Sequence, residues 1–222
     1  MEELKGFRTL PPPEKARLAA ATRERRFARG ATVFAQGQPA DSVWAVKAGL
    51  VHIVKFGPGG RKLVAEVIPP GELFGAIAAL ENRPYPATAI AAEPSAVWSV
   101  PSGLTRELCQ KYPAFRGAIL EQVASRLRSA HERLQSVALE PVEQRLARLL
   151  LTLADKVGQR TDGLPVVRTT RKELADMIGT TVETAIRITS KWQRAGVVRA
   201  ARHAVTITDP VALRAIVAGR GA

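Results

Sequence analysis

Residues 171–198 read RKELADMIGTTVETAIRITSKWQRAGVV, and this stretch decides the fold of the C-terminal part of the chain. Thr170 and Glu173 have the spacing of a capping box, in which a hydroxyl and a carboxylate accept hydrogen bonds from free backbone N–H groups at a helix start. Gly179 suits the left-handed conformation that commonly ends helices. Since residues 180–183 (TTVE) offer a second N-cap, the stretch predicts two helices joined by a tight turn.

The second of these helices is expected to end near Ala195 and to be both amphipathic and basic. Ala185, Ile188 and Trp192 stand at positions i, i+3 and i+7, which places them on one face and predicts that they belong to the core. Two short helices with a glycine turn between them, the second one basic, are typical of a helix-turn-helix. The pattern therefore predicts a module that binds DNA.

A different face of the second helix carries the candidate base contacts. Val182, Glu183, Ile186 and Arg187 lie together near its N-terminal end, where a recognition helix meets base edges. Arginine can donate two hydrogen bonds to guanine, and a carboxylate can accept one from cytosine. A plain Glu183–Arg187 surface pair, worth about 0.2–0.5 kcal/mol, is the alternative. The two apolar neighbours, which the core does not need, favour DNA.

A hairpin is expected directly after this helix, from strands at 197–199 and 204–208. It would place Arg199, Arg202 and His203 in a wing suited to phosphate contacts, which orient a protein on the duplex without reading sequence. Between Arg168 and Arg202 the chain has eight basic and three acidic residues. The complete set of predicted DNA contacts is Thr181, Val182, Glu183, Ile186, Arg187, Arg171, Lys191 and Arg202.

Before this module, the sequence after Pro113 has the period of a long helix. Part of its apolar stripe could pack on the protein's own sheet, but a seam sustained over nearly three heptads favours pairing with a second copy. Glu140-Pro141 interrupts the helix, and a second amphipathic helix is expected over 142–156. The heptad seam consists of Leu120, Val123, Leu127, Ala130, Leu134 and Val137, with His131 flanking it.

The N-terminal part of the chain reads as short strands separated by Gly/Pro turns. Such strands at regular spacing predict a sandwich or barrel. The run Gly57-Pro-Gly-Gly60 lacks the Lys-Ser/Thr of a phosphate loop, so a hairpin turn is the better interpretation. After the predicted C-terminal helix a loop is expected at 158–165, followed by a strand at Val166-Val167. The expected N-terminal strands are Ala31–Phe34, Ser42–Val46, Leu50–Phe56, Lys62–Val67 and Ala87–Ala92.

This order of parts resembles the CRP/FNR family of bacterial transcription regulators over nearly the whole chain. The resemblance is carried by residues 33–54 (VFAQGQPADSVWAVKAGLVHIV), 70–75 (PGELFG), 142–153 (VEQRLARLLLTL) and 170–198. It implies an α+β fold with three parts. These are a jelly-roll β-barrel domain like that of cyclic-nucleotide-binding proteins (1–112), a dimerisation helix (113–139) and a winged helix-turn-helix (140–222).

The resemblance also suggests what the recognition helix reads. It implies that Glu183 and Arg187 contact bases, and Val182 is similar to the FNR branch, where the CRP branch has arginine. Ile186 departs from both branches, because FNR-like proteins usually carry serine there. The implied half-site is similar to an FNR-type box containing TTG, and the resemblance does not assign its outer bases.

The barrel lacks the residues with which the family binds cyclic nucleotides. In the family, Gly-Glu-Leu and Arg-Ser hold the ribose and cyclic phosphate, but here the corresponding stretches are Gly75-Ala76-Ile77 and Pro86-Ala87-Thr88. A buried phosphate without a charged partner costs several kcal/mol, so cyclic AMP is not expected in the usual pose. Glu72 and Arg83 lie nearby in the sequence, but they do not align with the glutamate and arginine positions of the family.

Three alternatives stay open for this domain. A small apolar or neutral effector would contact the tentative pocket residues Glu72, Ile77, Ala87 and Ser129. The protein could instead act without an effector. As a third alternative, it could sense gases through haem with His52 or His131 as axial ligand, although lone histidines are more often structural. No other cofactor and no metal are expected.

Cysteine usage excludes another kind of sensor. The single cysteine, Cys109, cannot support the four-cysteine iron–sulfur cluster of the FNR oxygen sensor or an internal disulfide. It could serve as a thiol switch, but a buried, inert cysteine is the simpler interpretation.

The composition of the 222 residues bounds the class of protein. The net charge of +13 indicates an acidic partner, which we expect to be duplex DNA. The excess positive charge of the first 137 residues is expected either to form a solvated surface or to contact RNA polymerase. No apolar run reaches the roughly 20 residues of a membrane span, and the start resembles no signal peptide, so a cytoplasmic protein is expected. The absence of an H-x-H pair argues against a cupin-like enzyme, and 5% aromatic residues argue against an RNA-binding protein. A small-molecule-binding barrel module with a basic appendage is the alternative outside the family.

Overall fold

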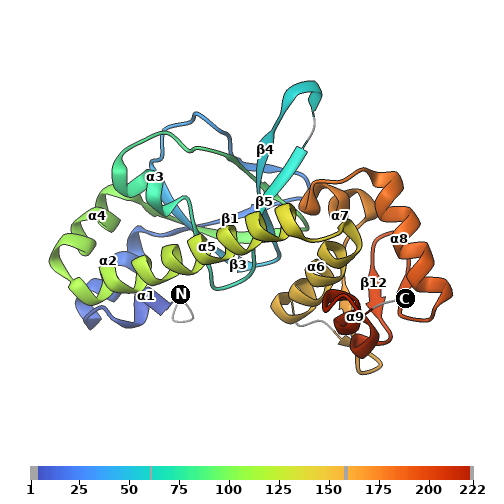
Figure 1. The fold of residues 1–222 in the computed structure, drawn as a ribbon. Coiled ribbons are helices and arrows are strands. Elements are labelled where there is room, and N and C mark those ends of the chain that lie inside the picture. The colour runs from blue at the N-terminus through green and yellow to red at the C-terminus, as the bar shows by residue number, and fades with distance from the viewer. Residues whose placement is uncertain (1–4, 61, 158–159, 221–222) are drawn as a thin grey trace. The chain divides into compact units, whose positions relative to one another are not determined.

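The computed structural model describes residues 5–60, 62–157 and 160–220 (Figure 1). The chain divides into two compact units. The first comprises the chain up to Gly60 together with Ala65–Ala130, and the second comprises Arg61–Val64 together with His131–Ala222.

The N-terminal unit is built on two antiparallel four-stranded sheets that contribute to one hydrophobic core, as in a jelly roll. The five predicted strands are confirmed, with ends that shift by one or two residues. Three further strands, β1, β6 and β8, were not predicted. In order across the sheets, the strands are β1 (Arg23–Phe27), β8 (Ser95–Pro101), β3 (Ser42–Ala48) and β6 (Leu73–Phe74) in one, and β2 (Thr32–Phe34), β7 (Thr88–Ala91), β4 (Val51–Phe56) and β5 (Lys62–Ile68) in the other.

An aromatic cluster fills the centre of this core. The rings of Phe34 and Tyr85 stack with centroids 3.7 Å apart, and Trp44 and Phe74 pack around them. The Trp44 indole donates a hydrogen bond to the Tyr85 hydroxyl (2.9 Å), which satisfies its buried N–H. Gly75 has φ 70°, and a Cβ there would lie 2.8 Å from the Tyr85 ring, so glycine is required.

Among the described residues, four α-helices lie wholly within this unit, in addition to the first part of the long helix that follows them. The last of them, α4, lies against β8 and β3, and its Cys109 is buried. Burial raises the pKa of that thiol, which favours the inert thiol form over the reactive thiolate. The helices are α1 (Lys5–Arg8), α2 (Pro12–Ala21), α3 (Ala76–Glu81) and α4 (Ser102–Lys111).

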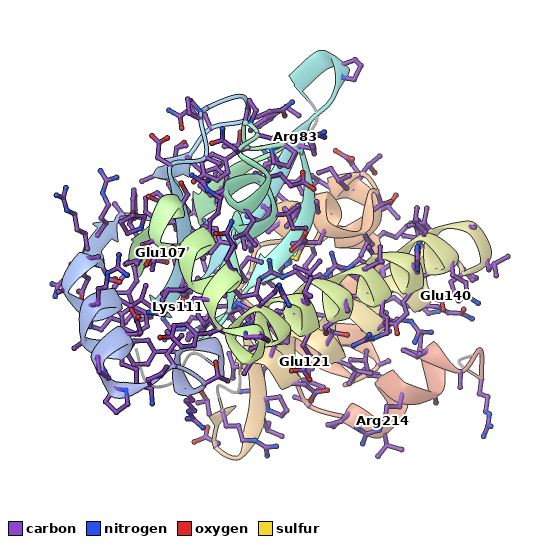
Figure 2. The ribbon with its side chains drawn as sticks, turned by 90° about the vertical axis from the view of Figure 1, so that its left-hand side faces the viewer. Arg83, Glu107, Lys111, Glu121, Glu140 and Arg214 are labelled. Atoms are coloured by element: carbon purple, nitrogen blue, oxygen red, sulfur yellow. The ribbon has the colours of Figure 1, made fainter. Side chains whose placement is uncertain are left out.

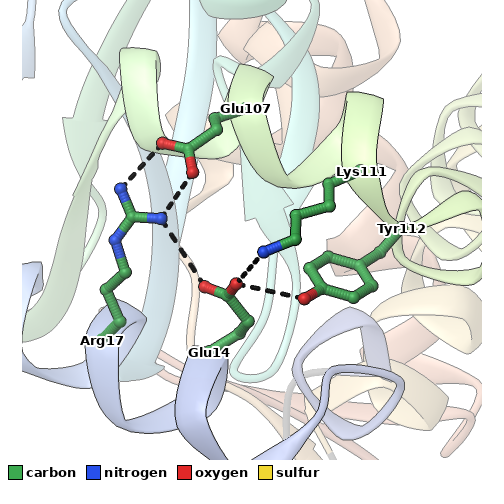
Figure 3. A network of polar contacts seen from close by, with 5 residues as sticks. All are labelled: Glu14, Arg17, Glu107, Lys111 and Tyr112. Carbon is green, nitrogen blue, oxygen red and sulfur yellow. Dashed lines mark hydrogen bonds and ion pairs between the residues drawn. The ribbon is translucent and has the colours of Figure 1, made fainter.

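A polar network joins α2 to α4 (Figure 3). The Lys111 ammonium lies 2.8 Å from one Glu14 oxygen, and the Tyr112 hydroxyl donates to the same oxygen at 3.0 Å. Arg17 donates to both carboxylate oxygens of Glu107, at 2.5 and 2.7 Å, and lies 3.6 Å from the other oxygen of Glu14. Glu107 and Lys111 project from the same helix, as the side-chain view also shows (Figure 2). Glu14 is 8% exposed, so it depends on these partners.

The network predicts a pH-dependent contribution to stability. The Lys111 ammonium, helped by the Tyr112 hydroxyl, holds the pKa of Glu14 below its usual value of 4.5. The contribution is therefore complete above pH 4.5 and lost as the pH falls through the lower pKa of the folded state. We expect Glu14→Gln to lower the thermal unfolding midpoint at pH 7 and to differ progressively less from wild type below pH 4.5.

A matched control for this change is Glu121→Gln, which alters an exposed glutamate of the following helix. Thermal unfolding of the three proteins, followed by circular dichroism from pH 7 to pH 3, makes the comparison. Equal midpoints for wild type and Glu14→Gln at pH 7 would show that the network does not stabilise the fold.

The helix α5 (Pro113–Leu139) runs from the first unit into the second. Its first turns are anchored, since Phe115 and Ile119 are buried in the N-terminal core. Farther along, large side chains of the predicted heptad seam stand uncovered in the single chain. Leu120 and Leu127 are each 58% exposed, and Leu134 and Val137 are 68% and 59% exposed.

The C-terminal unit combines helices with a small sheet in the strand order β11-β12-β10-β9. Part of the predicted loop at 158–165 is wrong, because β9 and β10 pair there as antiparallel strands; residues 158–159 lie outside the described residues. The elements are α6 (Val142–Val157), β9 (Arg160–Thr161), β10 (Leu164–Val167), α7 (Arg171–Ile178), α8 (Val182–Arg194), β11 (Val198–Ala200), β12 (Val205–Ile207) and α9 (Pro210–Val217).

Candidate nucleic-acid interface

The helix pair α7–α8 has the local geometry that the sequence predicts. The Thr170 hydroxyl accepts from the Glu173 N–H at 3.1 Å, and the Glu173 carboxylate accepts from the Thr170 N–H at 2.7 Å, which completes the capping box. Gly179 ends α7 with φ 68°. The Thr181 hydroxyl then caps α8 by accepting from the Thr184 N–H at 3.2 Å. These contacts define the turn between the two helices.

The helix α8 separates a buried side from an exposed one. Ala185, Ile188 and Trp192 are 0–5% exposed, which confirms that they belong to the core. On the opposite side Glu183 and Arg187 are exposed, as are Thr181, Lys191 and Arg202 of the predicted contacts. Val182 is half-buried and Ile186 is 48% exposed.

A carboxylate on α6, that of Glu143, contacts two side chains of α8. Glu143 accepts from the Trp192 indole at 2.9 Å and lies 3.1 Å from the Lys191 ammonium. No local sequence signal indicates this role of Glu143, because its partners lie nearly fifty residues away. Lys191 therefore has an anionic partner within the protein.

The wing formed by β11, β12 and the residues between them is attached to both helices of the pair. The Arg171 guanidinium donates to the carbonyl oxygen of Ala201. The Ala200 N–H donates to the side-chain oxygen of Gln193, at 3.2 Å, and the Thr169 N–H donates to the His203 carbonyl, at 3.1 Å. These contacts hold the wing at three of its residues, and Arg171 makes one of them.

The residues proposed for an effector come from different elements of the first unit. Glu72, just before β6, lies 3.4 Å from Arg126 of α5, which also lies 3.5 Å from Glu66. Next to it, the Leu73 N–H donates to the Gln122 side chain at 3.2 Å. Glu72 is therefore engaged by α5 in this structure.

The other three proposed pocket residues carry no charge. Ile77 of α3 is 52% exposed, Ala87 is buried, and Ser129 of α5 is half-buried. The neighbouring Thr88 hydroxyl accepts from the Gln36 N–H at 3.0 Å.

The two histidines proposed as haem ligands have different surroundings. His52 is 3% exposed in β4, whereas His131 is exposed on α5. Within the described ranges, no group of three or more histidine, cysteine or acidic side chains is arranged to hold a metal ion. The same ranges contain no helix with the length and apolar character needed to cross a membrane.

A jelly-roll unit, a long helix and a winged helix-turn-helix together define a class of two-domain DNA-binding regulators. Residues 24–112 match the cyclic nucleotide-binding domain family, and residues 144–216 match the Crp-like helix-turn-helix domain family. The chain is 30% identical over 201 residues to the CRP-like cAMP-activated global transcriptional regulator of Mycobacterium tuberculosis, covering 88% of this chain and 90% of that protein. The chain belongs to the CRP/FNR family of transcription regulators.

Other comparisons agree with this assignment. The transcriptional activator protein FnrA of Stutzerimonas stutzeri is 27% identical over 199 residues, which cover 89% of this chain and 81% of that protein. A crystal structure of a CRP-family transcriptional regulator from Thermus thermophilus superposes with a TM-score of 0.77 at 26% identity, covering 89% of this chain and 97% of that chain.

Proposed function

We propose that the protein is a homodimeric transcription regulator that recognises a near-palindromic DNA operator through α8. The observation that carries this proposal is the exposed side of α8, where Glu183, Ile186 and Arg187 project next to a basic wing. Two such helices related by a two-fold axis would enter successive major grooves about 34 Å apart.

The exposed heptad seam supports the dimer. Three leucines one heptad apart, each more than half exposed, form an apolar stripe along α5 that a second copy would cover. Rotation across this seam would set the spacing between the two recognition helices, and an effector would act by favouring one of two such arrangements.

We propose that the barrel does not respond to cyclic AMP held in the family's usual pose. The two stretches that would contact it, Gly75-Ala76-Ile77 and Pro86-Ala87-Thr88, contain no charged side chain that could pair with the phosphate, and the Thr88 hydroxyl is their one side-chain donor. A different small effector and activity without any effector are both compatible with this barrel. RNA polymerase is the expected protein partner, and exposed arginines on β1 offer it a basic surface.

Selection of bound duplexes from a random pool by the purified protein, with no ligand added, tests the proposal. We expect enrichment of two inverted half-sites about one helical turn apart, each with a conserved guanine. Addition of cyclic AMP should leave the selected sequence unchanged. Failure to enrich any duplex, or equal competition by unrelated single-stranded RNA, would contradict a sequence-specific DNA-binding function.

Contacts within the protein distinguish two kinds of basic residue, those that would contact DNA phosphates and those that position α8 and the wing. We propose that Arg202 contacts a phosphate, and that Lys191 and Arg171 mainly hold α8 and the wing. Each phosphate contact adds about −0.9 to the slope of log affinity against log salt, so a dimer that loses two should change by about 1.8. We therefore expect Arg202→Gln to flatten the slope by this amount and Lys191→Gln to leave it unchanged.

Fluorescence anisotropy with the selected duplex across a series of salt concentrations would measure both slopes. Each variant removes one positive charge from the same unit, so the two serve as controls for each other. A slope change for Lys191→Gln equal to that for Arg202→Gln would assign Lys191 to the phosphate contacts.

A further inference from the structure

The large apolar side chain on the exposed side of α8, that of Ile186, is only about half covered by its own unit. Ile188, the other isoleucine of this helix, is 5% exposed in the core, whereas Ile186 is 48% exposed. Its neighbours on the same side, Glu183 and Arg187, are charged and exposed. An isoleucine in this position leaves apolar surface in water between two ionic groups.

Two threonine hydroxyls near Ile186 make hydrogen bonds inside the helix. The Thr181 hydroxyl donates to that of Thr184 at 3.1 Å, and the Thr189 hydroxyl donates to the Ala185 carbonyl at 2.8 Å. These two threonine hydroxyls therefore make hydrogen bonds within α8 and its N-cap, and their donors do not point toward a ligand. Besides the charged pair, the exposed side of α8 presents the aliphatic group of Ile186 near the N-terminal end, with Ser190 exposed one turn later.

On these observations we infer that Ile186 is a specificity-determining residue that contacts the C5-methyl group of a thymine in each half-site. This inference rests on the proposed function. In the major groove the thymine methyl is the apolar feature of the base edges, whereas cytosine presents an N4 amino donor and purines present N7 acceptors. An isoleucine side chain cannot satisfy those polar groups, so it favours thymine over the other bases.

The geometry of the helix makes this contact favourable. A β-branched side chain has one strongly preferred rotamer in a helix, so Ile186 loses little freedom when it meets a base. Because Glu183 lies three residues before it on the same side, the thymine should neighbour the base pair that Glu183 reads. Val182, four residues before Ile186, extends the apolar strip toward the N-terminus of α8.

Replacing single thymines of the selected operator with deoxyuridine tests the inference. Deoxyuridine lacks the C5-methyl group and keeps every hydrogen-bonding group, so it isolates the apolar contact. With the wild-type protein we expect one position in each half-site at which the change weakens binding roughly fourfold, or roughly 15-fold when both half-sites are changed. With Ile186→Ser this loss should disappear, while losses at other thymines persist.

Two further arms keep the result interpretable. Ile186→Val retains a branched apolar side chain and should retain most of the thymine preference. Circular dichroism and sedimentation should show that Ile186→Ser folds and assembles like wild type, because the side chain is half exposed. Identical deoxyuridine effects for wild type and Ile186→Ser would overturn the inference. A variant that changes stability or assembly but keeps the wild-type deoxyuridine effects would overturn it as well.

The test also separates this inference from the proposed function. A protein that selects an operator but shows no coupling between Ile186 and a thymine methyl would remain a sequence-specific regulator with a different base reader at this position. A protein that selects no duplex would contradict the proposed function itself, and with it the inference that Ile186 reads a base.

Discussion

Leu127→Lys is expected to yield monomers that bind the operator roughly 100-fold more weakly, or worse, than the wild-type protein. Leu127 is 58% exposed in the single chain and occupies the middle of the heptad seam on α5. In a dimer its side chain would be buried against the partner, and a lysine there would have to lose its hydration without an anionic partner. Two half-site contacts that act together in the dimer would then act separately.

The expected loss has a defined pattern. Affinity for an isolated half-site should change little, because α8 and the wing lie far along the sequence from the substitution. Sedimentation equilibrium would give the mass, and anisotropy with full and half operators would give the two affinities. Ser125→Lys is the matched control, since Ser125 is exposed at a heptad position outside the seam. A Leu127→Lys protein that remains a dimer with full affinity would exclude the seam as the interface.

Local signals made the helix pair α7–α8 of the C-terminal unit predictable from sequence, whereas β9 and α9 were not predicted. The capping box at Thr170, the glycine at 179 and the apolar period of α8 each depend on residues within one or two helical turns. Each is also physically sufficient, because it satisfies backbone groups or buries one face of a helix without help from distant residues.

Other parts of the fold depend on distant partners and were missed. The strand β1 has the sequence RERRF, whose charges hide its strand character; it is an edge strand and exposes four of its five residues. Glu14 meets Lys111 across 97 residues, and Arg171 meets Ala201 across 30. Such contacts follow from tertiary packing, so composition and spacing could not reveal them.

The same distinction applies to the candidate interface. The sequence predicts eight residues at the DNA. The structure exposes Glu183, Ile186 and Arg187 on α8, but it also gives Arg171 and Lys191 partners within the protein. Basic residues near a recognition helix thus divide into those that face outward and those that orient the module. Charge counts alone do not make this division, because both groups contribute equally to the +13 of the chain.

Arg187→Ala is expected to cost about 1–3 kcal/mol for each half-site and to remove the preference for guanine at one position. Arg187 is exposed one turn after Glu183, near the N-terminal end of α8, where its guanidinium can donate in parallel to guanine O6 and N7. Arg187→Lys keeps the positive charge but loses the planar guanidinium that donates two parallel hydrogen bonds. Compared with Arg187→Ala, it should therefore recover nonspecific affinity more than base preference.

Guanine analogues identify the atoms involved. Replacing the conserved guanine with 7-deazaguanine removes the N7 acceptor and should weaken binding of the wild-type protein but not of Arg187→Ala. Arg194→Ala removes the same charge from the opposite end of α8, where Arg194 donates to the Ser190 carbonyl of its own helix, and should leave the guanine preference intact. If Arg187→Ala still discriminated guanine from 7-deazaguanine as wild type does, another residue would read this base. Because base preference and charge are measured on separate variants, a loss confined to Arg187→Ala would mean that the basic surface brings the protein to DNA and Arg187 chooses where it stays.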